Sequence, residues 1–175
     1  MNNIIIKALQ FASEKHKDQR RRGSGLPYVT HPIIVSELLR EYKSSKNLTS
    51  LIVASLLHDT LEDTDTTFQE ISNTFTPMIA GLVLELTSDM EKIKEIGKNP
   101  YLIQKCNGMT SYGLVIKLVD RLSNIMDGPT KKYCQDTLVL LGAIEIGREE
   151  ELSGTHQRII NDIRVEVNKF LNEGN

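Results

Sequence analysis

A histidine and several carboxylates directly follow the most hydrophobic segment of the sequence. Residues 51–57 contain no charged side chain. The eight residues after them include His58, Asp59, Glu62, Asp63 and Asp65. A helix that is apolar on every side is buried, and carboxylates at its end are costly unless a positive charge lies beside them. A divalent metal ion would supply that charge, so the sequence predicts a metal site here.

The spacing of these residues restricts how they can share one ion. Side chains four positions apart lie above one another on a helix, which would place His58 over Glu62 and Asp59 over Asp63. The adjacent pair His58 and Asp59 would point about 100° apart on the same helix. Both can therefore reach one ion only near a helix end or at a local distortion.

Further donors occur elsewhere in the chain. His31 precedes Pro32 at a predicted helix start, and Lys117, Asp120 and Asn124 form the polar stripe of a later, otherwise apolar helix. Imidazole and carboxylate ligands together suit Mn²⁺, Fe²⁺, Co²⁺ or Zn²⁺. Such a metal lowers the pKa of a coordinated water from about 15.7 toward about 7. The sequence therefore predicts hydrolytic chemistry.

The elements that must position these residues all read as helices. Apolar residues recur with a period near 3.6, and no convincing alternating strand is present. Helices are predicted at residues 5–16, 32–42, 49–57, 67–75, 77–86, 101–106, 111–127, 131–146 and 155–172. Thr49 is the expected cap of the buried helix, and Thr67 with Glu70 forms a capping box. A basic, glycine-containing loop is expected at 20–28, and the whole chain, 1–175, is predicted to be one all-α domain.

Composition excludes several classes of protein. The net charge of about −2 does not favour a nucleic-acid partner, and no run approaches the roughly 18 apolar residues that span a bilayer. Cys106 and Cys134 lack the spacing of a metal knuckle, so reduced thiols and a cytoplasmic location are expected. His16 and His156 have no evident companions and are interpreted as structural or surface residues. The sequence does not determine the oligomeric state, and a homo-oligomer is one of the alternatives.

Three segments carry a resemblance to a known family. They are RGSGLPYVTHP at 22–32, LLHDTLEDT at 56–64 and IKLVDRLSN at 116–124. In order and spacing they resemble the signatures of HD-domain metal-dependent phosphohydrolases, and more narrowly of the hydrolase domain of the RelA/SpoT family. The chain is similar to the stand-alone small alarmone hydrolases of that family, including the metazoan type. The resemblance implies an HD-domain helical bundle with a buried metal site.

The resemblance also implies a role for each matched residue. The metal, usually Mn²⁺, would be held by His31, His58, Asp59 and Asp120. Glu62 and Asp63 would activate the attacking water. The predicted substrate-binding residues are Arg22 for the guanine base, Asn124 for the sugar, Lys117 and Tyr28. The implied reaction is hydrolysis of the 3′-pyrophosphate of ppGpp or pppGpp to GDP or GTP and pyrophosphate.

The chain departs from the family pattern around the substrate. Gly23 follows Arg22 where the family commonly has lysine, and Asn99-Pro100-Tyr101 replaces a basic pair, with only Lys105 nearby. Tyr133 is a weak match for a tyrosine expected to help seat the nucleotide. Two alternatives therefore stay open beside the alarmone hydrolase. One is an HD phosphatase acting on another nucleotide such as NADPH, and the other is a non-catalytic nucleotide sensor.

Overall fold

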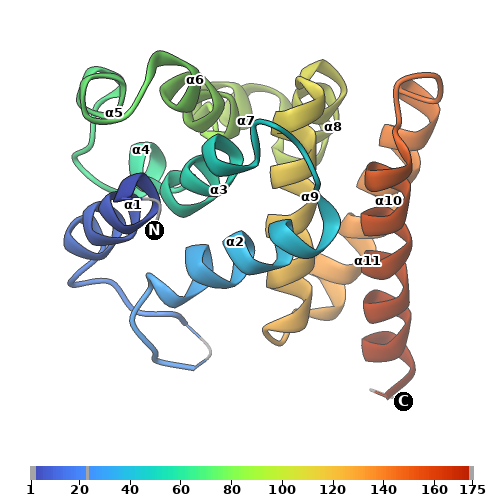
Figure 1. Cartoon of the computed structure of the whole chain (residues 1–175). Coiled ribbons are helices and arrows are strands. Elements are labelled where there is room, and N and C mark those ends of the chain that lie inside the picture. The colour runs from blue at the N-terminus through green and yellow to red at the C-terminus, as the bar shows by residue number, and fades with distance from the viewer. Residues whose placement is uncertain (1–2, 23, 174–175) are drawn as a thin grey trace. The chain divides into compact units, whose positions relative to one another are not determined.

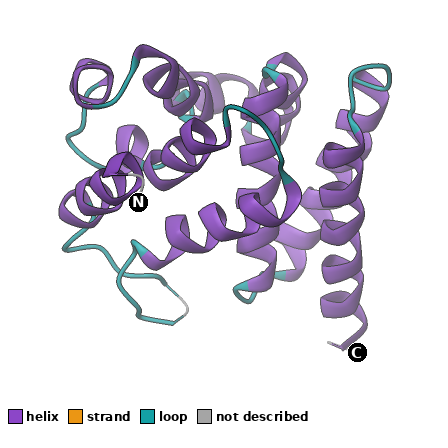
Figure 2. Cartoon of the chain, viewed as in Figure 1, coloured by secondary structure: helices purple, strands orange, loops and turns teal. Residues whose placement is uncertain are grey.

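The structure, a computed structural model, describes residues 3–22 and 24–173. These residues form eleven α-helices and no β-strand, with one isolated antiparallel bridge between Arg20 and Pro27 (Figure 2). The prediction of an all-α fold is confirmed. The described chain divides into two compact units, one ending at Thr87 and the other beginning at Ser88. The single domain over 1–175 stays a prediction.

The first unit is built around α3. Its helices are α1 (Asn3–Lys15), α2 (Thr30–Tyr42), α3 (Leu48–Leu57), α4 (Thr60–Asp63), α5 (Phe68–Thr74) and α6 (Pro77–Leu86). α3 packs against α1, α2 and α6 (Figure 1). Residues 51–57 of α3 are all buried, as their apolar composition predicts. Burial continues directly after α3, since His58 and Thr60 are also buried.

Local capping explains several helix starts in the first unit. The Thr67 hydroxyl accepts a hydrogen bond from the Glu70 amide at the start of α5, as the capping-box pattern predicts. The predicted cap at Thr49 is wrong, because α3 begins one residue earlier and Asn47 occupies the cap position without a side-chain bond. α2 also begins earlier than predicted, at Thr30, because backbone bonds to Pro27 and Tyr28 extend the preceding turn into the helix.

The second unit consists of five helices. They are α7 (Met90–Ile96), α8 (Lys98–Gly108), α9 (Ser111–Met126), α10 (Lys131–Gly147) and α11 (Gly154–Glu173). α9 packs against α11, and α10 packs against both α8 and α11. The apolar side of α9 is buried, while its other side carries the polar stripe predicted from the sequence. Thr110 caps this helix by accepting a hydrogen bond from the Gly113 amide.

The segment 88–110 is more helical than predicted. Two helices, α7 and α8, replace the single short helix expected at 101–106. Asp89 caps α7 through bonds from two amides, and Gly97, with a φ of 86°, ends α7 immediately before α8. The buried Tyr101 hydroxyl accepts a bond of 2.6 Å from the Asp89 amide. The helix predicted at 101–106 is present as part of the longer α8, whereas α7 was not predicted, because hydrophobic periodicity does not reveal a contact such as this one.

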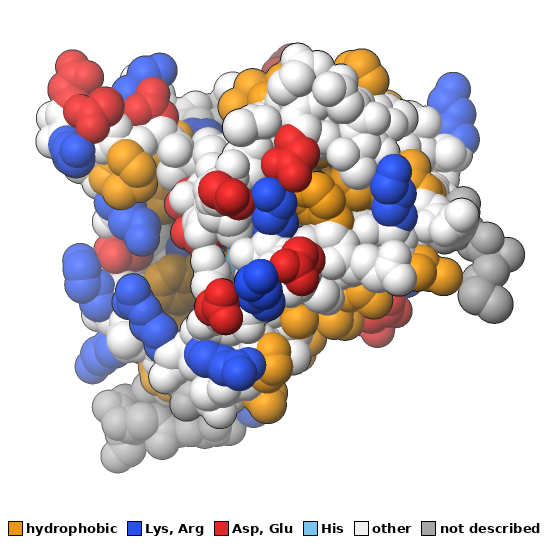
Figure 3. All heavy atoms as spheres, turned by 90° about the vertical axis from the view of Figure 1, so that its left-hand side faces the viewer, with side chains coloured by type: hydrophobic (Ala, Val, Ile, Leu, Met, Phe, Trp, Pro, Cys, Tyr) orange, Lys and Arg blue, Asp and Glu red, His pale blue; other side chains and the backbone are white. Residues whose placement is uncertain are grey.

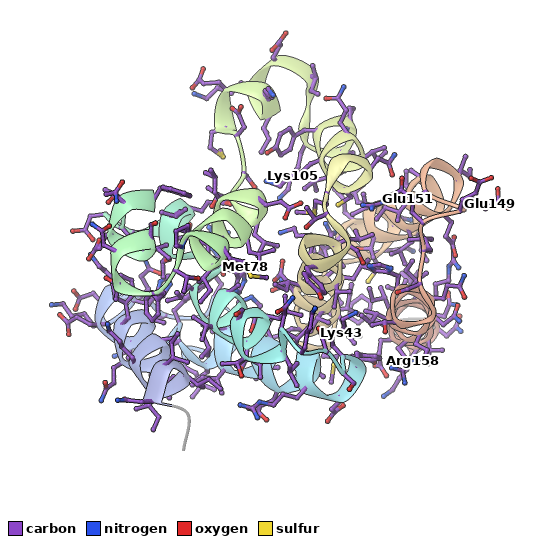
Figure 4. All side chains as sticks on the ribbon, turned by 45° about the horizontal axis from the view of Figure 1, so that its top comes forward. Lys43, Met78, Lys105, Glu149, Glu151 and Arg158 are labelled. Carbon is purple, nitrogen blue, oxygen red and sulfur yellow. The ribbon has the colours of Figure 1, made fainter. Side chains whose placement is uncertain are left out.

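A buried arginine fixes the start of α9 within the second unit. Arg148 donates hydrogen bonds to the backbone oxygens of Cys106 (2.9 Å) and Met109 (2.7 Å), next to the cap at Thr110. Its other guanidinium nitrogens bond Glu151, which lies on the turn between α10 and α11 (Figure 4). The position of α9 in this unit is therefore set by backbone contacts at its N-terminal end.

Both cysteines lie in the second unit, and charges of both signs occur on the exposed surface. Cys106 and Cys134 are free and buried, and burial raises the pKa of each thiol. Basic and acidic side chains both occur on the face shown in Figure 3. Among the described helices, none combines the length and the apolar character needed to cross a bilayer.

Candidate active site

The helix break predicted at His58 and Asp59 is present. α3 ends at Leu57 and α4 begins at Thr60, so the two residues lie on the turn between the helices. We call residues 58–63 the acid turn. The break brings the His58 Nε2 atom to 2.9 Å from Asp59 Oδ2, although adjacent residues on a continuous helix would diverge. His58 and Asp59 can therefore act on one ion.

The backbone of α3 fixes the orientation of the His58 ring. Its Nδ1 atom lies 2.7 Å from the carbonyl oxygen of Ser55. Because a carbonyl oxygen only accepts, Nδ1 carries a proton, and the lone pair of the neutral imidazole is on Nε2. This atom faces the carboxylate of Asp59 at the distance given above. Two electron-rich atoms so close together attract a cation, either a proton or a metal ion.

His31 brings a second imidazole to the same carboxylate. It lies in the first turn of α2, and its Nε2 atom is 3.8 Å from Asp59 Oδ2. The ring centroids of His31 and His58 are 5.2 Å apart, and both side chains are buried. Two imidazole nitrogens and a carboxylate oxygen form a donor set that fits a divalent transition metal. The first unit thus brings together three of the four predicted ligands.

Tyr28 lies against this donor set. Its hydroxyl donates a hydrogen bond of 2.5 Å to Asp59 Oδ2, and its ring packs 4.9 Å from that of His16 and 6.0 Å from that of His31, between centroids. Tyr28 was predicted to bind substrate. The hydrogen bond shows a further contact, which the sequence did not indicate, because it orients the carboxylate of a predicted metal ligand across 31 positions of the chain. Its role in substrate binding stays a prediction.

This contact gives a testable expectation for Tyr28→Phe. The ring contacts should keep the fold intact, while loss of the hydroxyl should weaken Mn²⁺ binding about 10- to 100-fold, as removal of outer-shell partners typically does. Calorimetric titration with Mn²⁺ measures the change. Tyr42→Phe, at the end of α2, is the matched control. Equal affinity of the two variants would show that the Tyr28 hydroxyl has no part in metal binding.

The predicted catalytic carboxylates, Glu62 and Asp63, lie at the exposed end of the acid turn. Partial burial of its carboxyl group raises the pKa of Asp63, and the negative charges of Asp59 and Glu62 raise it further. A carboxylate that binds a proton more readily than usual is suited to accept one from water. Ionised Asp63 is correspondingly unfavourable in the folded protein.

Asp63→Asn should therefore stabilise the metal-free protein. Because the folded pKa lies above the unfolded value, ionised Asp63 costs stability at neutral pH, and this cost disappears as the pH falls through the folded pKa. The variant should unfold at a higher temperature in EDTA at neutral pH and lose part of the stabilisation on mild acidification. Thermal unfolding across this range tests the sign. A lower melting temperature at neutral pH would contradict it.

The basic loop between α1 and α2 has defined structure. The Arg21 amide bonds the Leu26 oxygen at 2.9 Å, and the Gly25 amide returns to the Arg21 oxygen at 3.0 Å. The Arg21 guanidinium lies 6.0 Å from the centre of the Tyr28 ring. Arg22 is exposed, whereas Gly23 lies outside the described residues. The contact of Arg22 with a guanine base stays a prediction.

The polar stripe of α9 in the second unit holds a buried carboxylate. Lys117 Nζ lies 3.0 Å from Asp120 Oδ2, and Asn124 donates a bond of 2.8 Å to Asp120 Oδ1. Asp120 is 7% exposed. Lys117 thus pairs with an acid on its own helix, and its role in substrate binding stays a prediction. Each oxygen of Asp120 thus has a partner that fixes its direction.

Other residues singled out around the substrate have structural contacts in the second unit. The Tyr133 ring lies 4.7 Å below the Arg121 guanidinium, and burial raises the pKa of its hydroxyl. Lys105 lies over the buried Tyr101 at 5.7 Å. His156 is buried and bonded to Ser153 and the Ser111 oxygen, which confirms a structural role.

The sequence analysis overlooked two residues beside the acid turn. His16, expected to lack companions, is buried and contacts Gln19 and Tyr28. The side-chain amide of Gln19 in turn donates a hydrogen bond to the backbone oxygen of Asp63. In the sequence, their contact is indicated by their separation of three positions and by their place next to the basic loop, as His16 and Gln19 both precede it.

Comparison with known proteins gives a consistent result. Residues 8–107 match the HD domain family. The guanosine-3′,5′-bis(diphosphate) 3′-pyrophosphohydrolase MESH1 of Danio rerio is 33% identical over 125 residues, which cover 71% of this chain and 68% of that protein. A guanosine-3′,5′-bis(diphosphate) 3′-pyrophosphohydrolase of Aquifex aeolicus is 38% identical over 130 residues, 69% of this chain but only 17% of the longer relative.

A solved structure extends the similarity to nearly the whole chain. It was described as a metazoan ortholog of SpoT that hydrolyses ppGpp and plays a role in starvation responses. The match has a TM-score of 0.75 and 25% identity, and covers 99% of this chain and 96% of the other.

Proposed function

Because the chain belongs to the HD domain family that includes the MESH1 enzymes, we propose that it is a guanosine-3′,5′-bis(diphosphate) 3′-pyrophosphohydrolase. The substrates would be ppGpp and pppGpp, and the products GDP or GTP and pyrophosphate. The observation that carries the proposal is the convergence of His31, His58 and Asp59 at the helix break. The names of its relatives supply the substrate class, which the donor set by itself does not specify.

The proposed metal ligands are His31, His58, Asp59 and Asp120. The first three are supported by their donor atoms, and Asp120 by its place in the third family signature and its two fixed oxygens. We propose Mn²⁺ as the native metal, a choice that mixed nitrogen and oxygen ligation allows. When bound, the ion supplies Lewis-acid polarisation of a phosphoryl oxygen and acidifies water.

The acid turn supplies the base. Glu62 and Asp63 orient the attacking water and accept its proton as the water oxygen bonds the first phosphorus of the 3′-pyrophosphate. The bond from that phosphorus to the ribose 3′-oxygen breaks, and the 3′-oxygen takes up a proton as the product leaves. The raised pKa of Asp63 favours proton uptake at this position.

The remaining predicted residues would bind the substrate. We propose that Arg22, on the basic loop, contacts the guanine base and that Asn124 contacts the sugar. Lys117 would offset phosphate charge from its position beside Asp120. Tyr28 would orient Asp59 through the observed hydrogen bond, and its hydroxyl oxygen can still accept a hydrogen bond from a bound substrate.

The domain organisation, cellular location and partners of the enzyme are proposed on the same grounds. We propose a single HD phosphohydrolase domain over residues 1–175 that acts in the cytoplasm, where its nucleotide substrate and its free thiols both fit. The partner is a small-molecule nucleotide, and we expect no nucleic-acid partner. A homo-oligomer is compatible with these assignments.

Product analysis tests the function directly. Purified protein is incubated with Mn²⁺ and ppGpp, and in a parallel reaction with NADPH, each against an EDTA control. Metal-dependent release of GDP and pyrophosphate is the expected result. Release of orthophosphate from NADPH alone would move the protein to the phosphatase class, for which the departures at Gly23 and Tyr101 leave room. Metal binding without turnover of either nucleotide would indicate a sensor.

A further inference from the structure

Gln19 links the end of α1 to the acid turn. Its Oε1 atom lies 2.8 Å from Nδ1 of His16, which follows α1 and is 2% exposed. An amide oxygen only accepts, so the His16 ring donates and thereby fixes which end of the Gln19 amide faces it. The amide nitrogen is then free to donate in the other direction.

The other end of the amide reaches a proposed catalytic residue. Gln19 Nε2 donates a hydrogen bond of 2.7 Å to the backbone oxygen of Asp63, 44 positions away. The backbone oxygen of Gln19 also accepts a bond of 3.0 Å from the amide of Tyr28, the residue that orients Asp59. One residue therefore contacts the backbone of both groups that direct the site in the first unit.

The acid turn needs such an anchor. α4 has only four residues, and carbonyl groups at a helix end lack partners within the helix. Within the turn, the Asp63 amide bonds the Asp59 oxygen at 2.9 Å, and the Thr64 hydroxyl bonds the Thr60 oxygen at 2.6 Å. The oxygen of Asp63 is held by Gln19, from outside the helix. A short helix with few internal bonds takes its position from contacts of this kind.

We infer that Gln19, oriented by His16, is a positioning residue that holds Asp63 in the geometry needed to accept a proton from water. The inference rests on the proposed hydrolase function. It assigns to Gln19 an effect on the chemical step and none on metal or substrate affinity, since its side chain contacts only His16 and the backbone of Asp63 among the described hydrogen bonds, and neither residue is a proposed metal ligand.

Gln19→Met tests this assignment, with Gln69→Met as the matched control. Methionine keeps the length of the side chain but cannot make either bond. Gln69 is exposed, and its side chain bonds only Asn73 within α5 among the contacts described for it. We expect kcat for ppGpp to fall about 10- to 100-fold in Gln19→Met, as displaced supporting groups typically cost. KM and Mn²⁺ affinity should match those of the control.

A double variant and hydrogen exchange complete the test. If Gln19 acts through Asp63, Gln19→Met should cause no further loss of kcat in an Asp63→Asn background. Amides of the acid turn should exchange faster in Gln19→Met than in Gln69→Met, a readout that needs no activity. Unchanged exchange would overturn the inference even if the wild-type protein proved inactive on ppGpp. Wild-type activity with an additive loss would overturn it while leaving the proposed function intact.

Discussion

Asp59→Ala should abolish both catalysis and the response of the protein to metal. Asp59 is the carboxylate that approaches both imidazoles, so its removal leaves His31 and His58 without the proposed carboxylate ligand of the first unit. In the wild-type protein, Mn²⁺ at 100 times its Kd should add about 2.7 kcal/mol to the free energy of unfolding. In Asp59→Ala this increment should vanish, and kcat/KM should fall by about 10³-fold or more, because several kcal/mol of charge stabilisation are lost.

Thermal unfolding with Mn²⁺ and with EDTA measures the first effect, and pyrophosphate release measures the second. Asp65→Ala is the matched control, since this carboxylate follows the acid turn but is exposed and paired with Lys15. It should keep the full response to Mn²⁺. A metal response in Asp59→Ala equal to that of the control would remove Asp59 from the ligand set.

Glu62→Gln should separate metal binding from turnover. The amide has the size of the carboxylate but cannot accept a proton, so we expect kcat to fall by about 10²- to 10⁴-fold, the usual contribution of a general base. Glu62 is exposed. It is one of the two carboxylates proposed as the general base and is not a proposed metal ligand. The increase in melting temperature with Mn²⁺ should therefore be retained.

Steady-state kinetics on ppGpp, together with Mn²⁺ titration, distinguish these effects. Glu37→Gln, an exposed glutamate on α2, controls for the loss of one surface charge. Activity of Glu62→Gln within twofold of this control would exclude Glu62 from the mechanism. Loss of the metal response would instead make Glu62 a ligand. Either outcome would leave Asp63 as the remaining candidate base.

Local signals in the sequence predicted the helices well where neighbouring residues decide the structure. The apolar run 51–57, the cap at Thr67 and the proline that opens α6 act within a few positions, and each appears where expected. The segment 88–110 behaves differently. A bond between Tyr101 and the Asp89 amide links its two helices, and its polar composition predicted only part of α8 and nothing of α7.

In the candidate site, too, the sequence predicted some features and only the tertiary structure decided others. Ligand chemistry depends on residue type, so the sequence by itself predicted the donor set of His31, His58, Asp59 and Asp120, and required a helix end or a local distortion for His58 and Asp59 to meet. The tertiary structure of the first unit decided which groups orient Asp59 and Asp63. Tyr28 reaches Asp59 across 31 positions and Gln19 reaches Asp63 across 44, and contacts between such distant residues depend on how helices pack, which spacing along the chain does not encode.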